Sequence, residues 1–321
     1  MPSSLSSGCS GALGTGGVGP TATVRAVLTD QKIIVTGPTG QVALPVTLAL
    51  AEHNEVIGLA RFRDPDARAQ LEAAGVTCIE TNLAAGDFSA VPTAVDYVLN
   101  LAVIKSNRWD IDLAANAEAA GLLMQHCSGA KAMLHCSSTG VYQPAGRHEL
   151  AETDALGDNH RVMMETYAIA KIAAEAVVRT SARLFDLPTT IARLNVPYGD
   201  NGGWPAFHLA MIEAGQPVPV HPDRPNRFNP IHEDDIIRMI PALLEAASVP
   251  ATIVNWGGIE PVDLEEWCAF LGGIVGKDAT FVETDATIGG VTVDLSKMVE
   301  LAGPTTVGWQ DGLRRMVAAR G

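Results

Sequence analysis

Short apolar runs alternate regularly with longer polar stretches from residue 29 to about residue 196. The runs hold about five residues each, often β-branched, and lie at 32–35, 55–59, 76–79, 97–101, 132–136 and 189–194. Stretches with helical character separate them, which predicts βαβ units and a parallel sheet. Near-continuous apolar runs indicate strands that are buried on both faces. We therefore expect an α/β fold built on a doubly wound parallel sheet.

The second half of the chain follows a different pattern. After Asn195 the alternation breaks, and residues 197–230 are rich in Pro and Gly. A further apolar strand at 252–255 follows a helical stretch near 235–247. We expect a nucleotide-binding domain over 29–196 plus about 231–258, and a smaller, mixed C-terminal substrate domain over about 197–230 plus 259–321. Residues 1–20 hold six Gly and five Ser, so residues 1–28 are predicted to be a flexible Gly/Ser-rich tail.

Charge and cysteine content exclude several classes of partner. The 22 Lys and Arg against 36 Asp and Glu give a net charge of −14. Binding to nucleic acid or to an anionic membrane needs clustered cations, so a small molecule is the expected partner. The five cysteines are widely spaced and include no C-x-x-C pair, which suits a reducing cytoplasm. His221 and His232 lack metal-ligand spacing, so no metal site is expected.

A glycine-containing turn follows the first strand. Residues 36–43 read T-G-P-T-G-Q-V-A and lead directly into a helical stretch. Glycine permits a positive φ and the close approach of a phosphate, while the N–H groups at the start of a helix attract an anion. The turn therefore predicts a dinucleotide pyrophosphate site at Gly37, Thr39, Gly40, Gln41 and Val42. The alternative is an ordinary strand-to-helix turn.

The end of the second strand carries arginine in place of a carboxylate. An NAD site usually places Asp or Glu there to bind the ribose 2′-hydroxyl. This sequence has Arg61 and Arg63, and guanidinium groups suit a 2′-phosphate. We therefore expect NADP(H), with NAD as the alternative cofactor. Two solvated arginines flanking a helix are the competing interpretation.

A tyrosine and a lysine lie four residues apart at the start of the helix after the fifth strand. That spacing places Tyr167 and Lys171 on one helix face. A neighbouring ammonium group is expected to lower the pKa of a phenol toward the range of an acid–base catalyst. The fifth strand ends in two serines, and a serine hydroxyl there would bond the substrate oxygen. An ordinary surface pair is the alternative.

Jointly, these motifs resemble the extended short-chain dehydrogenase/reductase superfamily, in its NAD-dependent epimerase/dehydratase group. The resemblance covers about residues 31–300 and includes S-S-T-G-V-Y at 137–142, Y-A-I-A-K at 167–171 and R-L-N-V-P-Y-G at 193–199. It implies a Rossmann domain and makes Ser138 the catalytic serine, with Ser137 behind it. It also implies a homodimer through the helices near 110–127 and 164–185.

Other residues carry over by position within the motifs. Asn82 and Leu83 would lie beside the adenine, although Asn replaces the usual Asp. Leu101, Ala102 and Lys105 would contact the cofactor, and Asn116 would support the active site. The resemblance further implies that Asn195 and Arg227 grip a substrate diphosphate, with Arg227 one residue out of the usual spacing. Tyr142 either lines the substrate cleft or serves packing.

This set of residues bears on four functions, of which it favours two. The first is an NADP(H)-dependent oxidoreductase that uses Ser138, Tyr167 and Lys171 on a small-molecule carbonyl or alcohol. The alternative is a sugar-nucleotide epimerase with a retained NAD(P) cofactor. A 4,6-dehydratase is disfavoured because Thr139 and Gly140 stand where Asp-Glu is typical. A non-catalytic NADP sensor is disfavoured because the Ser-Tyr-Lys set is intact.

Overall fold

A seven-stranded parallel sheet forms the centre of the protein. In the computed structural model, which describes residues 28–320, its order is β12-β6-β5-β4-β1-β2-β3. The strands are β1 (Lys32–Thr36), β2 (Glu55–Ala60), β3 (Thr77–Glu80), β4 (Tyr97–Asn100), β5 (Ala132–Ser138), β6 (Thr189–Leu194) and β12 (Thr252–Trp256). The predicted doubly wound parallel sheet is confirmed. The tail predicted over residues 1–28 lies, Leu28 apart, outside the described residues.

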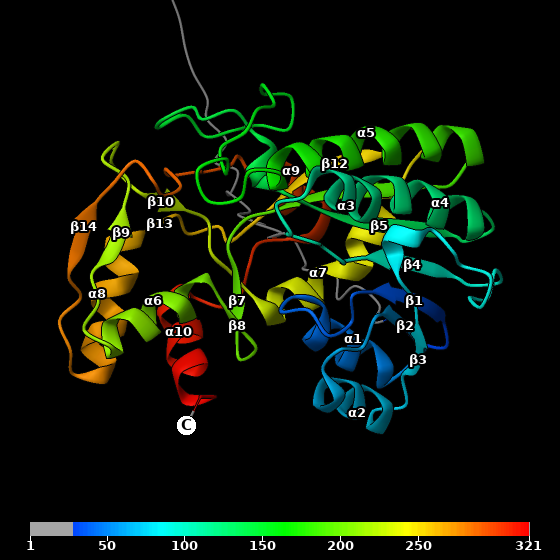
Figure 1. Cartoon of the computed structure of the whole chain (residues 1–321), viewed down its shortest axis with the longest axis horizontal. Helices are drawn as coiled ribbons and strands as arrows, with labels where there is room; N and C mark the ends of the chain where they lie inside the picture. The colour runs from blue at the N-terminus through cyan, green and yellow to red at the C-terminus, as the bar shows by residue number, and fades with distance from the viewer. Residues whose placement is uncertain (1–27, 321) are drawn as a thin grey trace, which may run out of the picture.

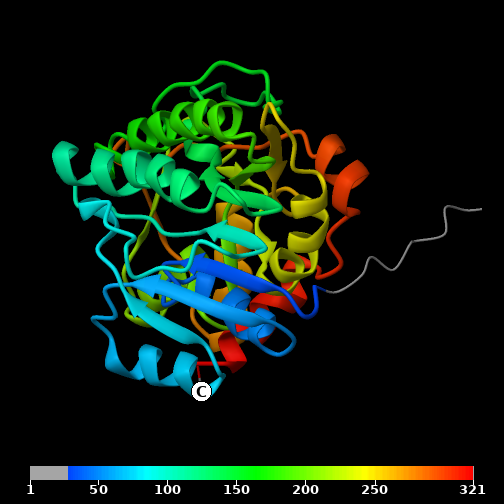
Figure 2. The same cartoon turned by 90° about the vertical axis from the view of Figure 1, so that its right-hand side faces the viewer.

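Helices cover both faces of this sheet (Figure 1). On one face lie α1 (Ala43–Ala51) and α7 (Glu233–Glu245), and on the other α3 (Trp109–Leu113), α4 (Ala119–His126) and α5 (Tyr167–Phe185), while α2 (Pro65–Ala73) packs on β3. Figure 2 shows the strands between the two helical layers. Side chains of β1 alternate between the layers: Ile33 and Val35 join one apolar core, and Ile34 joins the other. Each face of the sheet thus has its own core.

The helix predicted near 110–127 is interrupted in its middle. Between α3 and α4 the residues Ala114–Glu118 form one π-helical turn, η2. The Asn116 side chain donates to the carbonyl of Asp112 at 2.8 Å, four residues earlier. Since that carbonyl would normally receive the backbone N–H of Asn116, the side chain replaces a helical bond and widens the turn.

The second half of the chain adds small sheets and helices beside the main sheet. Short strands pair as β11-β7-β8, β10-β13 and β14-β9, with bounds β7 (Pro197–Gly199), β8 (Gly202–Gly203), β9 (Val218–Val220), β10 (Arg227–Phe228), β11 (Ile231–His232), β13 (Val262–Asp263) and β14 (Phe281–Glu283). Around them lie α6 (Trp204–Glu213), α8 (Leu264–Val275), α9 (Ser296–Ala302) and α10 (Trp309–Ala318). The short 3-10 turns are η1 (Leu83–Ala85) and η3 (Thr139–Val141). In Figure 1, α6, α8, β9 and β14 form a group to one side of the main sheet.

The strand order reverses between β1 and β4. From β1 the chain runs outward to β2 and β3, then returns to β4 on the other side of β1. In open α/β sheets, ligands bind at the carboxyl ends of the strands at such a switch point. Here the turn after β1 therefore faces the loop after β4. Among residues 28–320, no helix has the length and apolar character needed to cross a membrane.

Candidate active site

A cavity of about 840 Å³ opens at the carboxyl ends of the parallel strands. All the residues predicted for catalysis and cofactor binding line it: Gly37, Thr39, Gly40, Gln41, Val42, Arg61, Arg63, Asn82, Leu83, Leu101, Ala102, Lys105, Ser138, Tyr167 and Lys171. Asn195 also lines it, whereas Tyr142 and Arg227 lie outside it. We call the part formed by the glycine turn and the loops after β2, β3 and β4 the cofactor half. The substrate half is formed by residues 160–164 and by the second half of the chain.

The turn after β1 is shaped to receive a phosphate. Gly37 has φ +64°, and a Cβ built on it would lie 2.9 Å from Cα of Ala102, so a side chain is excluded both by conformation and by space. Within the described chain, the N–H groups of Thr39, Gln41 and Val42 make no hydrogen bond. No side chain caps the first turn of α1. Free N–H groups at a helix start fit the pyrophosphate of a dinucleotide.

A row of polar side chains lies beneath the cavity. Thr36 donates to Asn100 Oδ1 at 2.7 Å and accepts the N–H of Ala102 at 3.1 Å, which brings the loop after β4 against the glycine turn. Asn100 Nδ2 in turn bonds Nδ1 of His135 at 2.9 Å. Burial lowers the pKa of His135 to about 3, so its imidazole is neutral. His135 is the buried strand residue that its apolar neighbours predict.

Two unpaired cations stand at the end of β2. Arg61 and Arg63 are exposed at the cavity and form no ion pair within the described residues. Asp64, which sequence reasoning did not weigh, also lines the cavity. Its Oδ1, however, accepts the N–H groups of Asp66 at 3.0 Å and Ala67 at 3.1 Å and so caps α2. The free charge at this end of the cavity is positive.

Two helix residues fix the loop that carries Lys105. Asn116 accepts the N–H of Ile104 and donates to its carbonyl, each at 2.9 Å. Asp112 accepts bonds from Ser106 at 2.6 Å and from Thr166 at 2.5 Å, and so joins this loop to the residue before α5. Burial favours the neutral acid, but these hydroxyls and backbone N–H groups hold the pKa of Asp112 below its usual value. Sequence reasoning found Asn116 and missed Asp112, whose partners lie in two separate segments.

Lys171 and Tyr167 project from the first turns of α5. Lys171 Nζ donates to the carbonyl of Cys136 at 2.8 Å, and Lys105 Nζ lies 4.9 Å from the centre of the Tyr167 ring. Burial raises the pKa of Tyr167 to about 12, which the nearby Ser138 hydroxyl offsets only in part. The expected depression of this pKa by Lys171 is not found. The ammonium group is engaged by Cys136, and the burial of the phenol outweighs its influence.

Behind Ser138, the serine predicted to be catalytic, lies a buried ion pair. Ser138 Oγ accepts the N–H of Gly140 at 3.0 Å, and Ser137 Oγ donates to Glu175 at 2.6 Å. Arg193 binds the two oxygens of Glu175 at 2.9 and 2.7 Å, with both side chains 3% exposed. Two opposite charges that satisfy each other can be buried at this depth. The pair ties β5, β6 and α5 together directly under Ser138.

Two of the predicted substrate residues do not line the cavity: one lies in the core and the other on the surface. Tyr142 is fully buried, its hydroxyl bonds Asn255 at 2.5 Å, and its ring lies 4.8 Å from the Arg193 guanidinium. It therefore packs rather than lining the cleft. Arg227 forms a two-pronged pair with Asp263, at 2.6 and 3.0 Å, outside the cavity. The shifted spacing of Arg227 thus matches a side chain that points elsewhere.

Asn195 lines the cavity, but its amide is engaged by backbone. It donates to the carbonyl of Val291 at 3.0 Å and accepts the N–H groups of Val196 at 2.9 Å and Asn229 at 3.2 Å. Its oxygen already accepts two N–H groups and one of its two amide hydrogens is donated, which leaves a single N–H for a ligand. The structure therefore makes Asn195 a residue that positions the segment around Val291.

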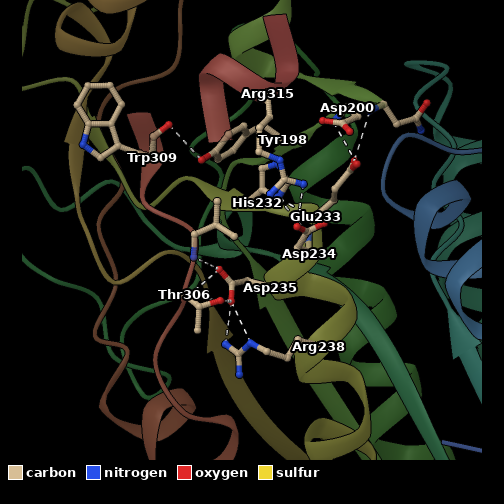
Figure 3. A network of polar contacts seen from close by, with 12 residues as sticks. Tyr198, Asp200, His232, Glu233, Asp234, Asp235, Arg238, Thr306, Trp309 and Arg315 are labelled. Carbon is tan, nitrogen blue, oxygen red and sulfur yellow. Dashed lines mark hydrogen bonds and ion pairs between the residues drawn. The ribbon is translucent and has the colours of Figure 1, made fainter. Parts of the chain in front are cut away.

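A polar network at the start of α7 reaches the glycine turn (Figure 3). Glu233 accepts the N–H groups of Asp200 at 3.1 Å and Asn201 at 3.4 Å, and Asn201 Nδ2 donates to the carbonyl of Gln41 at 2.9 Å. Two residues along α7, the buried Asp235 accepts bonds from Thr306 and pairs with Arg238 at 2.8 Å. The network anchors the loop after β7 against the cofactor half, and sequence reasoning missed it.

The sequence matches a known family over most of the described chain. The sequence model of the NAD dependent epimerase/dehydratase family matches residues 33–257. The chain belongs to this family. The match spans the glycine turn, the serine strand, the Tyr–Lys helix and the network at α7. No curated protein matches the sequence.

Solved structures with the same fold include two epimerases in complex with nucleotide sugars and one dehydratase. A mutant of the UDP-glucuronic acid 4-epimerase of Bacillus cereus, in complex with a fluorinated UDP-glucuronic acid and NAD, is 22% identical, with TM-score 0.78 over 90% of this chain and 98% of that one. The UDP-N-acetylglucosamine 4-epimerase of Methanobrevibacter ruminantium is 17% identical, with TM-score 0.79 over 91% and 99%. The dTDP-glucose 4,6-dehydratase of Streptomyces venezuelae, with NAD bound, is 21% identical, with TM-score 0.76 over 90% and 96%. At these identities the likeness to other structures shows the fold alone.

Proposed function

We propose that the protein transfers hydride between a nicotinamide dinucleotide and a carbonyl or carbinol carbon of a small molecule. The observation that carries this proposal is that Ser138, Tyr167 and Lys171 line the same cavity as the glycine turn. The unbonded N–H groups of the turn fit the pyrophosphate of such a cofactor. When bound, the dinucleotide supplies the hydride donor or acceptor.

The residues of the chain supply the proton and the orientation. In reduction, the carbonyl carbon gains a hydride and its oxygen takes the proton of Tyr167, so the substrate is reduced while the nicotinamide is oxidised. A phenol with a pKa of about 12 stays protonated at neutral pH, which suits this donation. Ser138 is placed to bond the substrate oxygen. The ammonium group of Lys171 donates to the carbonyl of Cys136 and holds this part of the serine strand beside Tyr167. The Glu175–Arg193 pair holds the serine strand in place.

For the cofactor we propose NADP(H). The support is local: Arg61 and Arg63 have no ion-pair partner among the described residues, while Asp64, the one carboxylate among the residues that line the cavity, caps α2 through its Oδ1. Guanidinium groups favour a 2′-phosphate over a 2′-hydroxyl. The Bacillus cereus epimerase and the dehydratase of similar fold were solved with NAD, which supports NAD as the competing cofactor.

Two net reactions fit this chemistry. The family and the nucleotide-sugar neighbours favour an epimerase that retains its cofactor and returns the hydride to the same substrate. The two free arginines favour net oxidoreduction, because NADP(H) commonly acts as an exchangeable cosubstrate. We propose net oxidoreduction, since the residues of the substrate half also favour it.

Replacing Tyr167 with Phe tests the proposed chemistry. We expect turnover to fall by about 10²- to 10⁴-fold, because the proton donor is lost. NADPH binding, followed by cofactor fluorescence, should change little. Turnover would be measured over a panel of carbonyl compounds by NADPH absorbance, and over UDP-sugars by product chromatography. Tyr97 begins β4 and so lies at the end of the strand away from the cavity. Tyr97→Phe is therefore the matched control and should leave turnover and NADPH binding unchanged. Near-normal turnover in Tyr167→Phe contradicts the proposal.

A further inference from the structure

We infer that the substrate half of the cavity takes an uncharged, largely apolar ketone, aldehyde or secondary alcohol, and not a nucleotide diphosphate. The inference rests on the proposed hydride transfer and names its substrate class. Three observations support it: the walls of this half are apolar, the nearby arginines lie outside it, and the few polar groups lie beside Tyr167.

The walls of the substrate half are apolar. They include Met163, Trp204, Phe207, Phe228, Ile288 and Val291. Phe207 lines the cavity while 71% exposed, so a ligand with an apolar body would remove a large aromatic surface from water. A diphosphate would leave that surface in contact with charged oxygens.

The aromatic part of this wall is fixed by its neighbours. The Trp204 ring meets Phe228 edge-to-face at 5.0 Å and Trp267 at 5.9 Å. Trp267 is itself held by a bond from its indole N–H to Nδ1 of His208 at 2.9 Å. Burial lowers the pKa of His208 to about 4, so no positive charge stands behind the wall. The wall cannot readily rearrange into a polar surface.

The cations that line the cavity all belong to the other half or to the catalytic set. Among the described lining residues these are Arg61, Arg63, Lys105 and Lys171. Diphosphate recognition usually relies on arginine or lysine, or on free N–H groups at a helix start. The helix start in this half, that of α6, has Pro205 in its first turn, which removes one of the N–H groups that a helix start offers to an anion.

Three arginines close to the substrate half do not line it. Arg161, which follows His160, lines a neighbouring pocket outside the cavity. Arg224 pairs with Glu265 at 2.6 Å and Glu283 at 2.9 Å, and Arg227 pairs with Asp263 at 2.6 Å. Both line a separate surface pocket that holds several carboxylates. Because acidic partners already satisfy these guanidinium groups, neither is free to bind a phosphate.

The polar groups of the substrate half gather at the reacting end. The His160 ring lies 5.2 Å from the Tyr167 ring, and Asn159 bonds its Nδ1. The ring fits there because Gly140 has no side chain, since a Cβ at this position would lie 2.9 Å from it. Burial lowers the pKa of His160 to about 4, which leaves a neutral imidazole beside Ser138 and Tyr167. One polar end and an apolar body is the pattern of a simple carbonyl compound.

Ligand binding to the NADPH-loaded protein tests the inference. NADPH fluorescence is measured first: absence of any dinucleotide binding would overturn the proposed function, separately from the substrate class. The loaded protein is then titrated with 1-aminoanthracene, a neutral fluorescent probe, and by calorimetry with UDP-glucose. We expect the probe to bind and UDP-glucose not to bind at millimolar concentration. Binding of UDP-glucose, or failure of the probe to bind, overturns the inference.

A pair of variants locates the bound probe. Phe207→Arg places a cation in the apolar wall, and we expect it to weaken probe binding at least about tenfold, because a charge resists burial against an apolar ligand. Phe281→Arg makes the same change on β14, outside the cavity, and should leave binding unchanged. Equal effects of the two variants would place the probe elsewhere and overturn the inference. Ketones and secondary alcohols from the carbonyl panel should show the same pattern in KM.

Discussion

Arg193 and Arg227 make the same two-pronged contact with a carboxylate, but in opposite settings. Arg193 and Glu175 are buried beneath Ser138, where they join α5 to the serine strand. Arg227 and Asp263 lie on the surface beyond the substrate half, with side chains 46% and 29% exposed. Under the catalytic residues, buried charge fixes geometry. Around the substrate half, the charged side chains lie on the outer surface, so the cavity wall is apolar.

Removing the carboxylate of each pair should show the largest contrast. Glu175→Ala leaves the Arg193 guanidinium buried without a partner, so we expect a loss of about 3–5 kcal/mol in the free energy of unfolding. Asp263→Ala should cost at most about 1 kcal/mol, because water solvates Arg227. Urea unfolding of both variants measures the difference. Equal losses would contradict the distinction between the two settings.

Asp112→Asn tests the second buried carboxylate of the catalytic region. We expect the free energy of unfolding to fall by about 1.5–3 kcal/mol at neutral pH, because hydrogen bonds to a charged acceptor are replaced by weaker ones. The folded pKa of Asp112 lies below its ordinary value of 3.8, so its stabilising effect is present above that pH and lost as pH falls through the folded pKa. The difference in the free energy of unfolding between wild type and variant should therefore become smaller below about pH 4. Urea unfolding at neutral and acidic pH measures it, and a constant difference would contradict the assignment.

The smallest expected effect concerns the free cations of the cofactor half. Arg61→Ala should weaken NADPH binding about tenfold while NADH binding changes about twofold or less, because only NADPH carries the 2′-phosphate. Cofactor fluorescence titrations measure both. Arg179→Ala, on the exposed side of α5, serves as control. Equal weakening of NADPH and NADH would remove the argument for NADP(H).

The sequence predicted those parts of the molecule that depend on local pattern. The strands and the turn at Gly37 could be predicted, because apolar runs and a glycine after a strand determine the local backbone conformation. The direction of Arg227 was not readable, because it depends on Asp263, which lies 36 residues further along the chain. The bond from Asn201 to Gln41 joins residues 160 positions apart. The phenol pKa of Tyr167 was misjudged because it depends on burial, which a Y-x-x-x-K spacing does not contain.

The amides of Asn195 and Asn229 fix the register of one segment, and specificity follows from that register. Asn195 holds the carbonyl of Val291, and Asn229 holds the N–H of Val293 at 3.0 Å. Within this segment Val291 lines the cavity, while its neighbours Gly290 and Thr292 line the outer, charged pocket. If this segment shifted by one residue, Gly290 or Thr292 would line the cavity in place of Val291. Substrate selectivity thus depends on the register of this segment as well as on its residues. A single insertion or deletion between the two asparagine contacts would change selectivity as thoroughly as a charged substitution.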